Sequence, residues 1–311
     1  MCCLFGILDY GNTLTVRQRT KVLSILAASC EVRGTDATGI AYNTGSRLTI
    51  YKRPKAAHKM SFRLPADANV IMGHTRMTTQ GNERFNYNNH PFYGKVGSTS
   101  FALAHNGILT NDDELQQKYR LPKTNIQTDS YVAVQLLEKQ TDLSFESMAN
   151  MAEDLEGSFT LSLLDNGNNV YFIKGNNPLC IYHWRDRGLY LYASTEDILK
   201  AALARMPFDF GIPEHVEINE GDMMRIASNG EVETAQFSLK NLYSYGGYGY
   251  PYSHYLDDWY TQPIRTESSY KDILKSMAQT FGYSPEDVDM LLAEGFTLQD
   301  IEDFLYEGVY C

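Results

Sequence analysis

Hydrophobic and polar positions follow two periods along the chain, and these predict strands in some segments and helices in others. A continuous apolar run predicts a buried strand over residues 2–9, and apolar residues at helical spacing predict a helix over 16–30. Short alternating segments predict strands at 38–42, 47–51, 70–75 and 101–105. Helices are then predicted from the cap Asn111, over about 128–140 and over 144–155.

The strand pattern returns after residue 155 as two predicted hairpins. Residues 158–164 and 170–174 flank the turn Asp165-Asn166-Gly167. Residues 179–184 and 189–193 flank a second turn. Because the two strands of a hairpin are antiparallel, the chain is predicted to be an α+β protein built on antiparallel sheets.

The composition changes near residue 240, where the stretch NLYSYGGYGYPYSHYLDDWYTQP is rich in tyrosine and glycine. This stretch predicts a linker over 240–265, which separates a domain over 2–239 from a small helical module over 266–311. In that module, Ser284 and Pro285 predict a capped helix start, and a second helix is predicted from Thr297. Two hypotheses remain for the aromatic residues: they dock a partner or a second copy of the chain, or they pack on the chain's own first domain.

Composition and charge exclude several classes of protein. The chain has 311 residues and a formal net charge of -11, which leaves no basic field for nucleic acid. No apolar run approaches the roughly 20 residues that span a bilayer, and no secretory signal is present, so the expected location is cytoplasmic with no membrane contact. The 5 cysteines are scattered and lack metal-ligand or disulfide spacing, as expected for reduced thiols.

Candidate chemistry is concentrated in short polar segments between the predicted strands. Arg76 and His105 each follow apolar residues that should be buried, where an unpaired charge or polar group is costly. Such residues therefore need partners, which a surface loop alone does not explain. The segments are RGTDATG (33–39), GHTRMTTQG (73–81), NNHPF (88–92), HNG (105–107) and TDS (128–130).

Cys2 and these segments, in this order and at these separations, resemble the class II glutamine amidotransferase domain, which is an N-terminal-nucleophile (Ntn) hydrolase. The resemblance extends to about Phe237. It implies a four-layer αββα sandwich of two antiparallel sheets, no cofactor, and glutamine as the substrate. It also implies hydrolysis of the glutamine side-chain amide to glutamate and ammonia.

By this resemblance, Cys2 is the nucleophile once the initiator methionine is removed. Its own α-amine, a group whose pKa in peptides is about 7.7–8.0, can then accept the thiol proton, so no separate histidine base is required. The alternative is a cysteine that merely occupies a strand position. Relatives commonly have glycine after the nucleophile, whereas this chain has Cys3, which is expected to point to the opposite face and to be buried.

The resemblance also assigns the oxyanion hole to the side-chain amide of Asn106 and the backbone N–H of Gly107. One such donor is typically worth about 10²–10³ in rate. The alternative for this Asn-Gly pair is an ordinary hairpin turn.

Glutamine recognition is expected to use both charged groups of its amino-acid head. The Arg76 guanidinium can make two parallel hydrogen bonds to the α-carboxylate, and Asp129 can accept from the α-ammonium. Thr79 and the backbone around Met77 would add neutral contacts. Asp129 also fits the role of an acid at a helix N-terminus, and the two roles are compatible.

Four further residues are expected to support the site. Arg33 is expected to form scaffold around the N-terminus. His74, His90 and His105 lack a companion carboxylate or thiol at ligand spacing, so buried hydrogen-bonding roles are expected for them and no metal site is. Gln80 and Met77 stand where many sugar-synthase members have histidine and tryptophan, so the acceptor specificity of those enzymes does not transfer.

Three hypotheses follow for the function of the whole chain. About seventy residues follow position 240, too few for the synthase domain of the complete amidotransferases. The first hypothesis is therefore a stand-alone glutaminase, or the glutaminase subunit of a two-chain amidotransferase with a separate ammonia-accepting synthase; a homo-oligomer is also considered. The second is an Ntn amidase that acts on another γ-glutamyl or linear amide. The third is a catalytically silent binding module.

Overall fold

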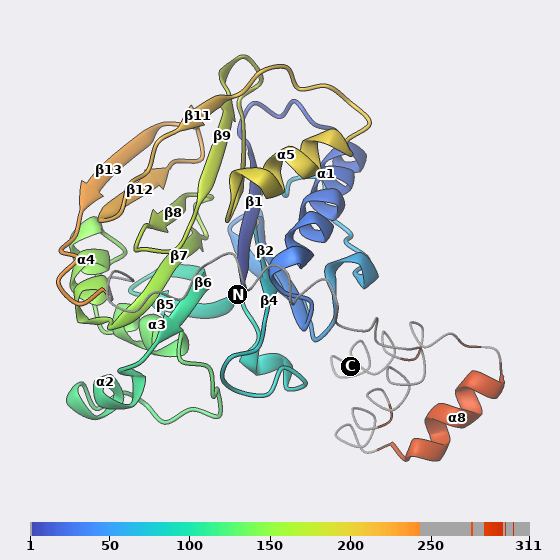
Figure 1. Ribbon diagram of the computed structural model, residues 1–311, viewed down its shortest axis with the longest axis horizontal. Coiled ribbons are helices and arrows are strands. Elements are labelled where there is room, and N and C mark those ends of the chain that lie inside the picture. The colour runs from blue at the N-terminus through green and yellow to red at the C-terminus, as the bar shows by residue number, and fades with distance from the viewer. Residues whose placement is uncertain (1, 243–274, 276–282, 295, 297–300, 302–311) are drawn as a thin grey trace, which may run out of the picture. The chain divides into compact units, whose positions relative to one another are not determined.

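The computed structural model describes residues 2–242, 275, 283–294, 296 and 301 (Figure 1). The elements of the first 240 residues are, in order, β1 (Cys3–Asp9), α1 (Val16–Ser29), η1 (Cys30–Arg33), β2 (Ala37–Thr44), β3 (Arg47–Arg53), η2 (Ala57–Lys59), β4 (Val70–Arg76), η3 (Asn86–Asn88), β5 (Phe92–Val96), β6 (Thr99–Leu109), α2 (Asp112–Lys118), α3 (Tyr131–Glu138), α4 (Phe145–Asp154), β7 (Gly157–Asp165), β8 (Val170–Ile173), β9 (Cys180–Trp184), η4 (Arg185–Arg187), β10 (Leu189–Ala193), α5 (Glu196–Ala204), β11 (Glu214–Val216), β12 (Asp222–Ile226) and β13 (Val232–Gln236).

Two sheets organise this part of the chain. Within the described residues, one sheet has 7 strands in the order β11-β9-β10-β1-β4-β2-β3, and the other has 6 strands in the order β13-β12-β8-β7-β6-β5. Every pairing between neighbouring strands is antiparallel. The predicted α+β class with antiparallel sheets is confirmed.

Strand β1 shows why the apolar run at the start of the chain is continuous. Its side chains alternate between the two faces of the sheet, so Phe5 and Ile7 belong to one buried cluster and Leu4 and Leu8 to another. Both faces of β1 are therefore covered. Cys3 lies in the first cluster and is fully buried, as expected.

Three apolar clusters define the layers. The first joins α1 and α5 to the 7-stranded sheet, and the second joins α3 and α4 to the 6-stranded sheet. The third lies between the sheets, where Leu4 and Tyr192 of one sheet pack with Ala104 and Phe172 of the other. Figure 1 shows the same order, with α1 and α5 on one side and α3 and α4 on the other. The expected four-layer αββα arrangement is confirmed.

The chain divides into two compact units, Met1–Ser244 and Tyr245–Cys311. The described part of the second unit contains α8 (Pro285–Ala293), which Ser284 caps as the sequence predicts: its hydroxyl accepts from the backbone N–H of Asp287. The predicted linker over 240–265, the second tail helix and most of 266–311 lie outside the described residues and stay predictions. No helix in the described ranges is both long and apolar enough to span a membrane.

Candidate active site

Cys2 lies at the start of β1, in the middle of the 7-stranded sheet. The next residue, Cys3, pairs with Thr75 of β4, so the sheet fixes the position of the thiol. Cys2 is 8% exposed, and its Sγ lies 3.5 Å from the carbonyl oxygen of Met77. Burial raises the pKa of the Cys2 thiol, while the contact with the Met77 backbone and the positive charge of Arg76 act in the opposite direction. The thiol therefore needs a base before it can act as a nucleophile.

Asn106 and Gly107 lie on β6, which faces β1 across the space between the sheets. Asn106 is fully buried. Gly107 has a φ of +149°, and a Cβ there would lie 1.9 Å from the carbonyl oxygen of Ser158. Only glycine fits this position without a backbone shift. The two residues belong to a continuous strand paired with β7, so the hairpin turn considered for this Asn-Gly pair is excluded.

Arg33 joins Cys2 to Asn106. Its Nε donates a hydrogen bond to the carbonyl oxygen of Cys2 at 2.8 Å, and its Nη2 donates to Oδ1 of Asn106 at 3.4 Å. Because a guanidinium is only a donor, the Asn106 atom that faces it must be the oxygen, which turns Nδ2 the other way. Arg33 therefore does more than support the N-terminus: it also sets the orientation of the Asn106 amide.

Ser194 provides a second link between the two sheets. Its hydroxyl oxygen accepts from the backbone N–H of Leu4 at 2.9 Å and from Nδ2 of Asn106 at 3.5 Å. Ser194 is fully buried at the end of β10, next to β1. Its motif, Ala193-Ser194-Thr195, belongs to the family resemblance, but no role for Ser194 was predicted from the sequence. The signal that could have indicated a role was a serine directly after the apolar strand predicted over 189–193, where a polar side chain would be buried.

Arg76 ends β4 and is 2% exposed. Its Nη1 donates to Oδ1 of Asn89 at 2.6 Å, and its Nη2 donates to the Gln80 carbonyl oxygen and, at 3.4 Å, to Oγ1 of Thr128. Burial lowers the pKa of the guanidinium, although the group remains a cation at neutral pH. The bond to Gln80 fixes the segment that follows β4, and the other two bonds connect Arg76 to Asn89 and Thr128. Met77 is half-buried there, and Thr79 is exposed.

Asp129 lies two residues before α3 and is 3% exposed. Its Oδ2 accepts from the backbone N–H of Leu109 at 2.7 Å, and its Oδ1 accepts from the backbone N–H and the hydroxyl of Ser130 at 2.8 and 3.0 Å. Asp129 therefore contacts β6 three residues after Asn106. Neither this contact nor a role for Ser130 was predicted from the sequence.

The three histidines of the motifs are buried close together. His74 places Nε2 2.9 Å from the carbonyl oxygen of His105, and His105 places Nδ1 2.7 Å from Oγ of Ser130. Neither ring nitrogen of His90 has a hydrogen-bond partner among the described residues. Its ring packs instead against His74 and Phe92, with centroids 4.3 and 4.4 Å away.

Burial dominates the titration of these histidines. It lowers the pKa of His74 to about 3, and it also lowers the pKa values of His90 and His105. All three imidazoles are therefore neutral at neutral pH. In the part of the chain that the structure describes, no group of three or more histidine, cysteine, aspartate or glutamate residues is arranged to hold a metal ion.

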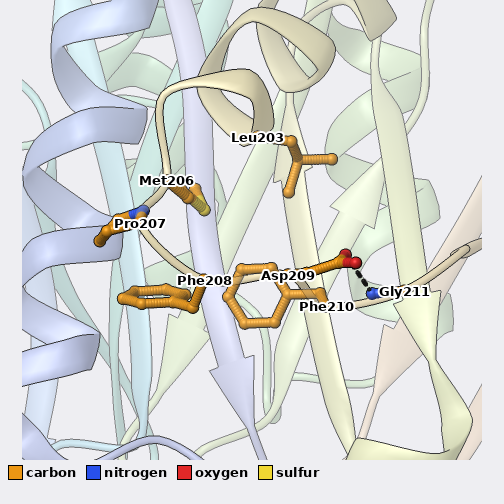
Figure 2. A pocket seen from close by; sticks show the side chains of 7 residues that line it. All are labelled: Leu203, Met206, Pro207, Phe208, Asp209, Phe210 and Gly211. Atoms are coloured by element: carbon orange, nitrogen blue, oxygen red, sulfur yellow. Dashed lines mark hydrogen bonds between the residues drawn. The ribbon is translucent and has the colours of Figure 1, made fainter.

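A cavity of about 480 Å³ lies elsewhere, along the segment that follows α5 (Figure 2). Figure 2 shows the Phe208 and Phe210 rings there with Met206, while Asp209 binds the backbone N–H of Gly211 at 2.8 Å. None of its lining residues belongs to the motifs or contacts Cys2, so we do not assign it to the chemistry of the Cys2 site.

Comparisons with known proteins agree with this arrangement. Residues 74–201 match a family described as "Glutamine amidotransferase domain". The glutamine–fructose-6-phosphate aminotransferase (isomerizing) of Bacillus thuringiensis subsp. konkukian is 35% identical over 161 residues, which cover 49% of this chain and 26% of that protein. The enzyme of the same name from Staphylococcus aureus strain Mu50 is 30% identical over 190 residues, which cover 58% of this chain and 30% of that protein.

A solved structure shares the fold. The glutamine phosphoribosylpyrophosphate amidotransferase of B. subtilis, complexed with ADP and GMP, superposes with a TM-score of 0.62 at 20% identity, over 77% of this chain and 50% of that one. The fold is therefore that of the Ntn amidotransferases. Together with the sequence matches, it shows that this chain contains a class II glutamine amidotransferase domain. The matches span less than a third of the length of the curated relatives.

Proposed function

We propose that this chain hydrolyses the side-chain amide of glutamine, with Cys2 as an N-terminal nucleophile. The observation that carries the proposal is the position of Arg33, which binds the Cys2 carbonyl oxygen at 2.8 Å and the Asn106 side chain at 3.4 Å. One guanidinium therefore holds the proposed nucleophile and the proposed oxyanion donor in a fixed relation. Such positioning of reacting groups can supply a large part of a rate enhancement.

The chemistry needs no group beyond the chain and water. After removal of Met1, the free α-amine of Cys2 takes the thiol proton, which overcomes the effect of burial on the thiol. The thiolate attacks the carboxamide carbon, and the carbonyl oxygen becomes an oxyanion bound by Nδ2 of Asn106 and the N–H of Gly107. The oxyanion collapses, the C–N bond breaks, and the nitrogen leaves as ammonia with the proton from the amine. Water then hydrolyses the γ-glutamyl thioester and releases glutamate.

Recognition of glutamine is proposed for Arg76 and Asp129. Arg76 is proposed to bind the α-carboxylate through guanidinium protons that its contacts with Asn89, Gln80 and Thr128 leave available. A carboxylate oxygen can accept more than one hydrogen bond, so Oδ2 of Asp129 can accept from the α-ammonium besides the Leu109 N–H. Met77 and Thr79 are proposed to line the same end of the site.

The destination of the ammonia is proposed separately. The relatives are named for transfer to fructose 6-phosphate, and their matches to this chain cover only 26–30% of their length. We propose that the domain described here supplies ammonia to a separate synthase or releases it. Coupling to such a synthase would be seen as glutamine hydrolysis that accelerates when the synthase and its acceptor are added.

The test compares two neighbouring cysteines. We expect Cys2→Ala to abolish release of glutamate and ammonia from glutamine, because no other group can form the thioester. Cys3→Ser is the matched control, since Cys3 lies on the opposite face of β1 in the apolar cluster beneath α1; its loss of activity should be far smaller. Intact-mass measurement should show that active protein begins at Cys2. Equal losses from both substitutions, or full turnover with Met1 retained, would refute the N-terminal-nucleophile mechanism.

A further inference from the structure

The two proposed oxyanion donors are enclosed by a bridge of hydrogen bonds that no motif predicts. On one side of Asn106 and Gly107, His105 places Nδ1 2.7 Å from Oγ of Ser130. On the other side, the backbone N–H of Leu109 donates to Oδ2 of Asp129 at 2.7 Å. Ser130 and Asp129 are neighbours just before α3, so one short segment holds β6 at residues 105 and 109.

The Ser130 hydroxyl closes this bridge. It lies 3.0 Å from Oδ1 of Asp129 and 2.7 Å from Nδ1 of His105, but it has only one proton. A neutral His105 carries its proton either on Nδ1, which then donates to the Ser130 hydroxyl oxygen, or on Nε2, which lies 3.4 Å from the carbonyl oxygen of Ser158 and then donates to it. In both tautomers Nδ1 of His105 stays bonded to the Ser130 hydroxyl, and the backbone N–H of Ser130 donates to Oδ1 of Asp129 at 2.8 Å. The hydrogen bonds therefore run without a break from His105 through Ser130 and Asp129 to Leu109.

The bridge is rigid because its members are buried. His105 and Ser130 are each 1% exposed and Asp129 is 3% exposed, so water does not compete for these bonds. The His105 ring also packs against Gly107: its Nε2 would lie 2.7 Å from a Cβ built on that glycine. A rotation of the His105 ring would therefore displace the Gly107 backbone, whose N–H is a proposed oxyanion donor.

We infer that Ser130 is a positioning residue for the oxyanion hole, acting through His105 and Asp129 on the strand that carries Asn106 and Gly107. This inference rests on the proposed function. Ser130 itself touches neither glutamine nor the reacting atoms in this scheme. Its contribution is expected in the transition state, when negative charge develops and donor placement matters, and not in the binding of the glutamine head.

The test uses Ser130→Ala in the full chain, with Ser162→Ala as the matched control. Ser162 is also fully buried and lies on β7 opposite Ala104 of β6, outside the bridge. For Ser130→Ala we expect kcat for glutamine to fall about 10–100-fold, less than the roughly 10²–10³ for complete loss of a donor, with KM within about twofold of wild type. Ser130→Thr keeps the hydroxyl and should recover most of kcat, provided that it folds.

An inhibitor separates positioning from general damage. The γ-aldehyde analogue of glutamine accepts the Cys2 thiol at its carbonyl carbon and gives a tetrahedral hemithioacetal, which resembles the transition state. Its inhibition constant should rise with Ser130→Ala by the same factor as kcat/KM falls, while that of glutamate stays unchanged. If the alanine variant fails to fold, Ser130→Cys fills the same space with a weaker hydrogen-bonding group and should show the same pattern.

A measurement independent of turnover keeps the two proposals distinguishable. Hydrogen–deuterium exchange of the peptide covering residues 105–109 should be faster in Ser130→Ala than in wild type and unchanged in Ser162→Ala. Faster exchange with unchanged kcat would overturn the positioning role, and so would unchanged exchange. If wild-type protein exchanges as expected but hydrolyses no glutamine under any condition, the proposed function fails, while the exchange data still decide whether Ser130 holds the strand.

Discussion

Arg33 connects the proposed nucleophile and the proposed oxyanion donor. Both of its contacts require the planar fork of a guanidinium, because Nε and Nη2 bind two different residues on two different sheets. A lysine at this position would keep the positive charge but could not reach both partners in the same geometry. The role proposed for Arg33 therefore depends on the shape of its guanidinium as well as on its charge.

We expect Arg33→Lys to lower kcat for glutamine by about 10–100-fold, with a smaller change in KM, because the Asn106 amide loses the contact that orients it. Steady-state kinetics test this expectation. Arg187→Lys is the matched control: Arg187 also donates from Nε and Nη2, at 3.0 and 3.2 Å, but to the carbonyl oxygens of Phe210 and Asp209 away from the site. Equal kinetic losses in the two variants would contradict a specific role for Arg33.

The burial of His90 leads to a prediction about how the free energy of unfolding depends on pH. Because burial lowers its pKa in the folded state, only the unfolded chain binds a proton as the pH falls below the usual histidine pKa of about 6.5. The unfolded state then holds more protons, so the free energy of unfolding decreases as the pH falls. Each such histidine contributes a slope of up to about 1.4 kcal/mol per pH unit. His74 and His105 add to the same effect.

We expect His90→Phe to make the acid dependence shallower, by up to about 1.4 kcal/mol per pH unit, because one titrating group is removed. No hydrogen bond of the described residues is lost, since neither ring nitrogen of His90 has a partner among them. Urea unfolding between about pH 4.5 and 7.5, a range that brackets the usual histidine pKa, measures the slope. His58→Gln removes a histidine that is 58% exposed and serves as the control. An unchanged slope in His90→Phe would show that His90 binds protons to the same extent in the folded and unfolded states, which contradicts the prediction.

At the level of single residues, the sequence indicated the candidate site residues but not the hydrogen bonds between them. The motifs identified Cys2, Arg33 and Asn106, and the structure brings these three together. The contacts of Ser194 and Ser130 with the proposed site residues were not predicted. Ser194 binds Leu4, 190 positions earlier, and nothing in the periodicity of one chain reports a contact at that separation. Serine is also common in ordinary turns and caps, so its type alone carries little information.

At the level of elements, strands with a continuous or alternating apolar pattern were predicted well. Strand β1 and helix α1 were expected at 2–9 and 16–30 and are observed at Cys3–Asp9 and Val16–Ser29. The predictions stopped short where strands extend into polar motifs. The strand expected at 101–105 continues to Leu109 as β6, because pairing with β7 carries Asn106 and Gly107 within the sheet.

Strand β5 and helix α5 are among the elements that were not predicted, although their signals are present in the sequence. Strand β5 alternates buried and exposed residues, but its central Gly94 weakens the pattern. A Cβ on Gly94 would meet the Phe101 ring at 2.4 Å, so this glycine reflects close packing and not a turn. Helix α5 begins after Thr195, whose hydroxyl accepts from the backbone N–H of Ile198 at 3.4 Å. That cap was readable as a helix start in the sequence.

At the scale of the whole molecule, the fold places strand ends from both sheets around one site. Cys2 lies at the start of β1 and Arg76 at the end of β4, and because these neighbouring strands are antiparallel, both residues lie at the same end of the strands in the middle of the 7-stranded sheet. Asn106 comes from the other sheet. The layer arrangement followed from the resemblance, whereas hydrophobic periodicity alone gives the strands without their order. The strand order in the sheets reflects pairings between distant segments.

The last prediction concerns residues 266–311. Every residue proposed to bind or react with glutamine lies between positions 2 and 129, and the strands that hold them end with β13 at Gln236. The described chain continues to Leu242, which forms a bridge with Gly157, so truncation after residue 265 retains all of these contacts. We therefore expect the chain ending at 265 to hydrolyse glutamine with kcat and KM within about twofold of the full chain.

Sedimentation and thermal unfolding of the two chains test the two hypotheses for the tail, since both chains keep the aromatic stretch. A change in assembly state on truncation would support docking of residues 266–311 to a second copy. An unchanged assembly state with a lower Tm would instead support packing on the chain's own first unit. In either case hydrolysis should persist. A truncated chain that remains folded but is inactive would contradict the assignment of the complete site to Met1–Ser244, and it would require a residue beyond position 265 in catalysis or glutamine binding.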